Sequence, residues 1–142
     1  MTVDQLDVRQ SVLRKTFGKK KALACIEEAL SRNKGEIKPH SRALLLLGKI
    51  ELSGTFSPTL AEEIRSVASK ISKENPRQAV RLFRGLGRLW MKWQCAGCPV
   101  TAVNDPRSHF MIGYKLALQA GADDQIKKIK AEARSVGILL QV

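Results

Sequence analysis

Apolar side chains recur along this chain at every third or fourth position, in stretches separated by Gly, Pro, Asn and Ser. That spacing places them on one face of a helix, and proline before a stretch or glycine after it is typical of helix ends. The pattern predicts a mainly α fold, a compact domain of about six or seven short helices. The expected helices carry their apolar positions within residues 3–17, 23–30, 39–53, 60–71, 76–93, 106–120 and 126–136.

Three of the expected helices begin with the same device, a side chain that can cap a helix followed by proline. The cap oxygen accepts a hydrogen bond from an otherwise unpaired amide, and proline at the first helical position has no amide that needs a partner. These pairs predict where the later helices begin. They are Ser57-Pro58, Asn75-Pro76 and Asp105-Pro106.

The excess of basic over acidic residues indicates which classes of partner the protein attracts. The 142 residues carry 25 Lys and Arg against 13 Asp and Glu, a formal net charge of +12. Such an excess attracts nucleic acid or anionic membranes without specificity. The length suits one domain over residues 1–142, and no apolar run approaches the roughly 18 residues of a membrane span. Three cysteines and a first segment without an apolar signal core lead us to expect a cytoplasmic or nuclear protein.

Residues 76–93 hold a row of cations and no acid. On a helix, at about 100° per residue, the row fills an arc of roughly 80° opposite an apolar face that includes Trp90 and Trp93. Solvated helix faces ordinarily mix signs, because like charges at this spacing repel, and the arginine fork fits phosphate. The row therefore predicts an unpaired, exposed surface for a polyanion, with a solvated face as the alternative. Its members are Arg77, Arg81, Arg84, Arg88 and Lys92.

Gly85 and Gly87 lie inside this expected helix, each at a cost of about 0.5–1 kcal/mol relative to Ala. The apolar and basic positions keep their phase across both glycines. We therefore expect an intact helix, in which the missing side chains let another backbone, of protein or nucleic acid, approach closely.

Further cations extend the candidate surface, although each cluster alone is more typical of a solvated patch. The N-terminal candidates for nucleic-acid binding are Arg14, Lys15, Lys19, Lys20 and Lys21. A second cluster on the last helix comprises Lys127, Lys128, Lys130 and Arg134.

Residues 41–103 resemble a winged helix-turn-helix in the order of their elements. A helix is followed by "SPTLAEEI" at 57–64, a short turn and the basic helix. Residues 94–103 contain Gly, Pro and β-branched residues, which predict a loop or a small β-hairpin turning at Ala96-Gly97. The resemblance implies that the basic helix enters the major groove of DNA. The expected helix over 60–71 is longer than that motif has.

These features favour a nucleic-acid-binding protein, with DNA slightly favoured and a role in regulating transcription or replication. RNA is the nearest alternative, because a basic helical surface also suits duplex or structured RNA. A basic helix with two tryptophans is also found in membrane-surface and helix-in-groove modules. The other helices have apolar faces of their own to bury, so we expect Trp90 and Trp93 in the core and no membrane partner. The apolar tail at 138–142 either folds onto the core or pairs with a partner, which leaves a homodimer open.

Cys95 and Cys98 form a C-x-x-C motif, with His109 farther along the chain. Zinc takes four such ligands in a tetrahedron, so these three residues are zinc candidates, with Cys25 or His40 needed to complete the set. A redox pair and two ordinary thiols beside a turn are the alternatives. No phosphate-binding loop, H-E-x-x-H or G-x-S-x-G motif occurs, so we expect no enzyme and no cofactor.

Overall fold

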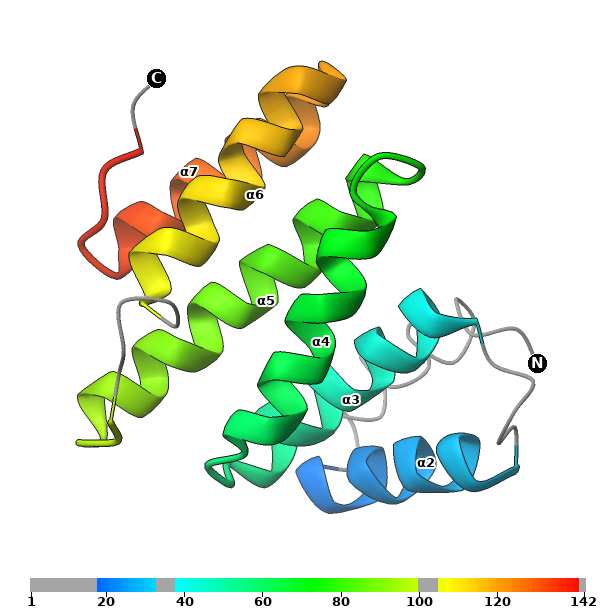
Figure 1. Cartoon of the computed structure of the whole chain (residues 1–142). Coiled ribbons are helices and arrows are strands. Elements are labelled where there is room, and N and C mark those ends of the chain that lie inside the picture. Colours follow the sequence, from blue (N-terminus) through cyan, green and yellow to red (C-terminus); the bar gives the residue numbers. More distant parts are fainter. Residues whose placement is uncertain (1–17, 33–37, 100–104, 141–142) are drawn as a thin grey trace.

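The computed structural model describes residues 18–32, 38–99 and 105–140. These residues form helices in the order that the apolar pattern predicts, so the mainly α fold is confirmed. The helix expected over residues 3–17 lies outside the described ranges. The helices, labelled in Figure 1, are α2 (Lys19–Arg32), α3 (Pro39–Ser53), α4 (Pro58–Ile71), α5 (Pro76–Cys95), α6 (Pro106–Ala120) and α7 (Asp123–Ser135).

Helix α5 is the centre of the arrangement. It packs against α3, α4, α6 and α7, whereas α2 packs on α3. Figure 1 shows that α4 crosses α5 on one side, whereas α6 and α7 run along the other side of α5. Helix α2 lies at the end of the molecule away from α7. Among the described helices, none has both the length and the apolar character that crossing a membrane requires.

The aromatic face of α5 is part of the core, as the sequence predicts. Trp90 and Trp93 are almost wholly buried, and their ring centroids lie 4.9 Å apart at an interplanar angle of 88°. Phe56, before α4, meets Trp93 edge to face at 5.0 Å. The quadrupoles of the aromatic rings favour this edge-to-face geometry, which stabilises the contact beyond the burial of apolar area alone. The indoles of α5 therefore hold α5 against the segment that precedes α4.

The glycines of α5 serve contacts within the protein. The helix runs unbroken across both, as expected from the phase of its side chains. A Cβ on Gly87 would lie 2.7 Å from Cε2 of Phe110 on α6, and one on Gly85 would clash with Leu47 on α3. The expected approach of another backbone is not seen here among the described residues. Side chains of α3 and α6 occupy these positions instead, and both glycines are buried.

The predicted winged-helix hairpin is not supported by the structure. Helix α5 continues to Cys95, and the described residues contain no strand. The amide of Gly97 donates to Gln94 at 3.1 Å, and that of Cys98 donates to Trp93 at 2.9 Å. With Gly97 at φ +85°, this is a Schellman helix end, which needs a left-handed residue at that position. The turn expected at Ala96-Gly97 thus ends a helix, and residues 100–103 lie outside the described ranges.

Two of the three predicted caps are made. The side chain of Asn75 accepts from the amide of Gln78 at 3.4 Å, and that of Asp105 accepts from the amide of Arg107 at 3.0 Å. Ser57 makes no side-chain cap bond, and its hydroxyl donates to the carbonyl of Thr55 at 3.3 Å. All three helices nevertheless begin with proline where the sequence places it.

Candidate anion-binding surface

The cationic row of α5 faces acids on neighbouring helices. Arg77 Nη1 lies 3.1 Å from Oδ1 of Asp124, in the first turn of α7. Successive arginines along α5 contact successive residues along α7, so the two helices run in the same direction. Helix α7 therefore lies beside α5, and its acids reach the row.

Arg84 and Arg88 join three helices in one ionic network. Nε of Arg84 donates to Oε1 of Glu132 at 3.1 Å, and Nη1 of Arg84 donates to Oε1 of Gln125 at 2.9 Å. Arg88 donates to the other oxygen of Glu132 at 2.9 Å and to Oε1 of Glu51 on α3 at 3.1 Å. Glu132 thus accepts from both arginines at once, and the network ties α3 and α7 to α5.

The pKa values in this network follow its geometry. Burial alone would raise the pKa of Glu132, but hydrogen bonds and charge from Arg84 and Arg88 outweigh it and hold that pKa below 4.5. Burial lowers the pKa of Arg88, and the carboxylates of Glu51 and Glu132 outweigh it, so that pKa is raised. Both directions favour the charged forms, so the network is ionised at neutral pH.

The prediction that the cationic row is unpaired is wrong for three of its members, whereas the prediction that it is exposed holds for Arg77 and Arg88 and is wrong for Arg84. Arg77, Arg84 and Arg88 have carboxylate partners, and the side chain of Arg84 is only 14% exposed. Arg81 is half-buried and donates to Gln78 at 3.3 Å. Lys92 is exposed in the last turn of α5, where a cation complements the helix dipole. The row works mainly as an attachment site for α3 and α7.

The N-terminal candidates lie apart from the row. Lys19, Lys20 and Lys21 are exposed in the first turn of α2, a position where the dipole disfavours cations. Figure 1 places α2 at the end of the molecule away from α7. Arg14 and Lys15 lie outside the described residues. The structure therefore does not bring these lysines together with the cations of α5 and α7.

The zinc candidates are not brought together either. Cys95 is exposed in the last turn of α5, and Cys98 follows the turn and is part-buried. His109 is buried at the start of α6, its ring near Phe83 and its Nδ1 3.0 Å from the carbonyl of Asp105. Roughly 18 Å of helix separates Phe83 from Cys95, at about 1.5 Å per residue. Within the described ranges, no three His, Cys, Asp or Glu side chains form a group that holds a metal.

The outer face of α7 carries the exposed cations that the sequence leaves as a secondary cluster. At about 100° per residue, Lys127, Lys130 and Arg134 fall within roughly 60°, and all three are exposed. No acid among the described residues forms an ion pair with any of them. We call these three residues the α7 stripe. It differs from the α5 row because its charges remain open to solvent.

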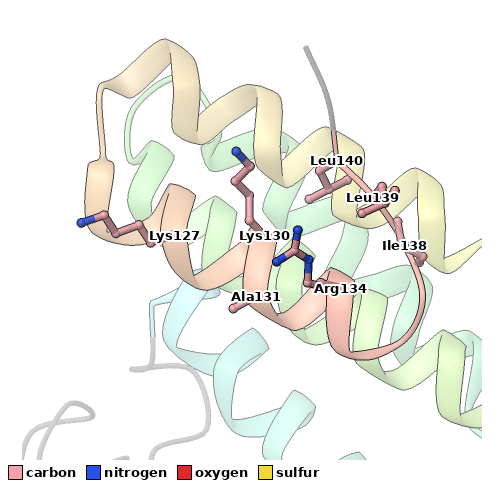
Figure 2. A pocket seen from close by; sticks show the side chains of 7 residues that line it. All are labelled: Lys127, Lys130, Ala131, Arg134, Ile138, Leu139 and Leu140. Atoms are coloured by element: carbon pink, nitrogen blue, oxygen red, sulfur yellow. The ribbon is translucent and has the colours of Figure 1, made fainter.

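A pocket of about 500 Å³ lies between the α7 stripe and the segment that follows α7. Ile138, Leu139 and Leu140 form its apolar side, and Ala131 lies between the cations. Figure 2 shows the Arg134 guanidinium beside the segment that follows α7, Lys130 one turn earlier on the helix, and Lys127 nearer the start of α7 with its head pointing away from the other two. The pocket therefore combines positive charge on one side with aliphatic surface on the other.

The pocket exists because the chain reverses after α7. Gly137, at φ +83°, ends the helix in a Schellman motif, with the amide of Ile138 donating to Ala133 at 2.8 Å. The reversal buries Ile138 and Leu140 against α6 and α7, whereas Leu139 points outward and stays 63% exposed. The predicted folding of the tail onto the core is confirmed for residues 138–140.

Tyr114 of α6 supports one cation of the stripe. Lys130 Nζ lies 5.8 Å from the centroid of the buried Tyr114 ring, close enough for a cation–π attraction. This contact restrains the Lys130 side chain without neutralising its charge. Lys130, which also lines the pocket, therefore keeps its capacity to bind an anion.

No protein-family model, no curated protein and no solved structure matches this chain. Its function has to follow from its own residues.

Proposed function

We propose that the protein binds nucleic acid, and that the α7 stripe is its principal contact with phosphate groups. The observation that carries the proposal is the stripe itself, three exposed cations on one helix face without an ion-pair partner among the described residues. The formal net charge of +12 adds a long-range attraction for polyanions. Arg77, Arg84 and Arg88 of the α5 row, in contrast, already form ion pairs with carboxylates of the protein itself.

The dimensions of the stripe suit a phosphate backbone. From Lys127 to Arg134 the helix rises about 10 Å, at about 1.5 Å per residue. One strand of a duplex carries a phosphate every 3.4 Å or so of helix axis, so the stripe spans roughly three phosphates. Arg134 offers a fork that holds one phosphate through two hydrogen bonds, while the lysines act as mobile point charges.

Contacts of this kind position a protein on nucleic acid without reading its sequence. A preference for DNA over RNA requires an accessible recognition helix followed by a wing. Helix α5 is instead packed on several sides by other helices, so neither DNA nor RNA is favoured on that ground. The choice between them rests with the test below.

Fluorescence anisotropy with labelled DNA and RNA, single-stranded and duplex, at 50 and 200 mM salt tests the proposal directly. We expect binding at low salt that weakens at high salt, because each neutralised phosphate releases bound counterion. With about three phosphate contacts, log K should fall with log salt at a slope of about 2–3. Absence of binding to all four probes at 50 mM salt would rule out nucleic acid as the partner.

A further inference from the structure

The pocket beside the α7 stripe offers a ligand two kinds of contact. Lys127, Lys130 and Arg134 supply positive charge, and Leu139 and Leu140 supply aliphatic surface within the same space of about 500 Å³. Ligand pockets in proteins typically measure about 300–1,000 Å³ and combine apolar lining with a few polar groups. A ligand that fits it joins an anionic group to an apolar one.

From these features we infer that the pocket takes one unpaired nucleotide of a single strand, a refinement that rests on the function proposed above. The phosphates lie along the α7 stripe, and the base enters the pocket against Leu139. In a duplex, the bases are paired and stacked, so proteins reach only their edges in the grooves and no base face is available to a concave pocket. Unpaired bases can be splayed out and received by a protein surface.

Leu139 is the residue that best separates this inference from simple charge attraction. It is 63% exposed, so it contributes little to the core, and a base above it would cover an apolar surface now open to water. A neighbouring Arg134 guanidinium provides a planar group on which a base also stacks. The pocket therefore recognises the base face in general and not one particular base.

The test compares Leu139→Asn with Ile112→Asn, a matched change on α6. Ile112 is also an exposed aliphatic residue, and it does not line the pocket. Each variant is titrated with a labelled 12-nucleotide single strand and with the blunt duplex of the same sequence. We expect Leu139→Asn to weaken single-strand binding by about threefold to fivefold, with duplex binding unchanged and Ile112→Asn like the wild type.

A second variant and two further ligands keep the outcome decisive. Ala131→Phe fills the pocket from its helical side and should also weaken single-strand binding selectively. If Leu139→Asn and Ala131→Phe both leave the ratio of single-strand to duplex affinity unchanged, the nucleotide pocket is wrong, although nucleic-acid binding stands. Inorganic polyphosphate that competes as well as the single strand would show that no base is bound. Binding to anionic vesicles that Leu139→Asn abolishes, with no binding to either oligonucleotide, would overturn both proposals in favour of a lipid surface.

Discussion

Replacement of Glu132 by Gln tests whether the arginine row of α5 is structural. The substitution keeps the shape of the side chain and removes the charge that Arg84 and Arg88 share. Arg84 is only 14% exposed, and its guanidinium is left without a carboxylate, so only the neutral amide oxygens of Gln125 and of the new glutamine can accept from it. Loss of one partner from a buried pair costs about 3–5 kcal/mol. Because Arg84 is partly exposed to solvent, we expect the loss of its carboxylate partner to lower the free energy of unfolding by less, about 2 kcal/mol.

Arg88 adds less to this loss. It keeps Glu51 as a partner and is 42% exposed, so its share is about 0.5 kcal/mol, that of a surface pair. The free energy of unfolding should therefore fall by about 2–3 kcal/mol, with a drop in Tm of about 8 °C for a chain of this size. The free energy of unfolding is measured by urea denaturation, with the fluorescence of the buried Trp90 and Trp93 as the probe.

The matched control is Glu28→Gln in the exposed pair that Glu28 forms with Arg32 on α2. An exposed pair at this spacing contributes about 0.3–0.5 kcal/mol. Equal losses from Glu132→Gln and Glu28→Gln would refute the structural role of the row. The pKa of Glu132 is held below 4.5 in the folded protein, so its contribution is full above about pH 4.5 and is lost as the pH falls through the folded value. The difference between wild type and Glu132→Gln should shrink accordingly in acid.

Three further predictions concern the core and the helix ends. Gly87→Ala should lower the free energy of unfolding, measured in urea, by about 1–2 kcal/mol. The new methyl group meets the Phe110 ring, and the cost of this overpacking exceeds the gain in helix propensity. A stabilised variant would contradict the packing of Gly87 against Phe110. Burial lowers the pKa of His109 below 6.5, so its unfolded form binds more protons and the stability it contributes is lost as the pH falls below about 6.5. His109→Gln should therefore lose less stability than the wild type between pH 7 and pH 5, and parallel profiles would show that His109 does not titrate in this range. Asp105→Ala should lower the unfolding free energy by about 1 kcal/mol, whereas Ser57→Ala should change it by a few tenths at most, because of these two residues only Asp105 makes a cap bond. Equal effects would argue against that assignment.

The helices could be predicted from the sequence because their signals are local. Proline at Pro58, Pro76 and Pro106 begins three of them, and the apolar period identifies the buried face of each. The unbroken course of α5 across its two glycines followed from the same phase. The hairpin was mispredicted because Gly97 ends a helix, and a single Gly near Pro and β-branched residues does not distinguish a helix end from a hairpin turn.

The partners of the arginine row could not be predicted, because they lie far away in the chain. Glu51, Asp124 and Glu132 are 37 to 48 residues from the arginines they meet, and a helical wheel of α5 alone shows no acid. One signal was present: on a helical wheel of α7, Glu132 falls beside the buried Gln125, about 60° from Ile129, on the border of the buried face. An acid at such a border indicates a cation on the neighbouring helix. The folding of the tail onto the core was one of two alternatives that its apolar residues allow, but the pocket also depends on how the reversal at Gly137 places Leu139 and Leu140 beside the cations of α7.

The salt dependence of binding by two charge-matched variants tests the central claim most directly. Lys127→Gln/Lys130→Gln changes the α7 stripe, and Lys19→Gln/Lys20→Gln removes the same charge from the first turn of α2. If the stripe binds phosphate, the α7 variant should lower the slope of log K against log salt by about 2 and the affinity by about tenfold or more, while the α2 variant keeps both near wild type. Equal losses in the two variants would show that net charge alone attracts nucleic acid, and a larger loss in the α2 variant would place the contact at the opposite end of the molecule.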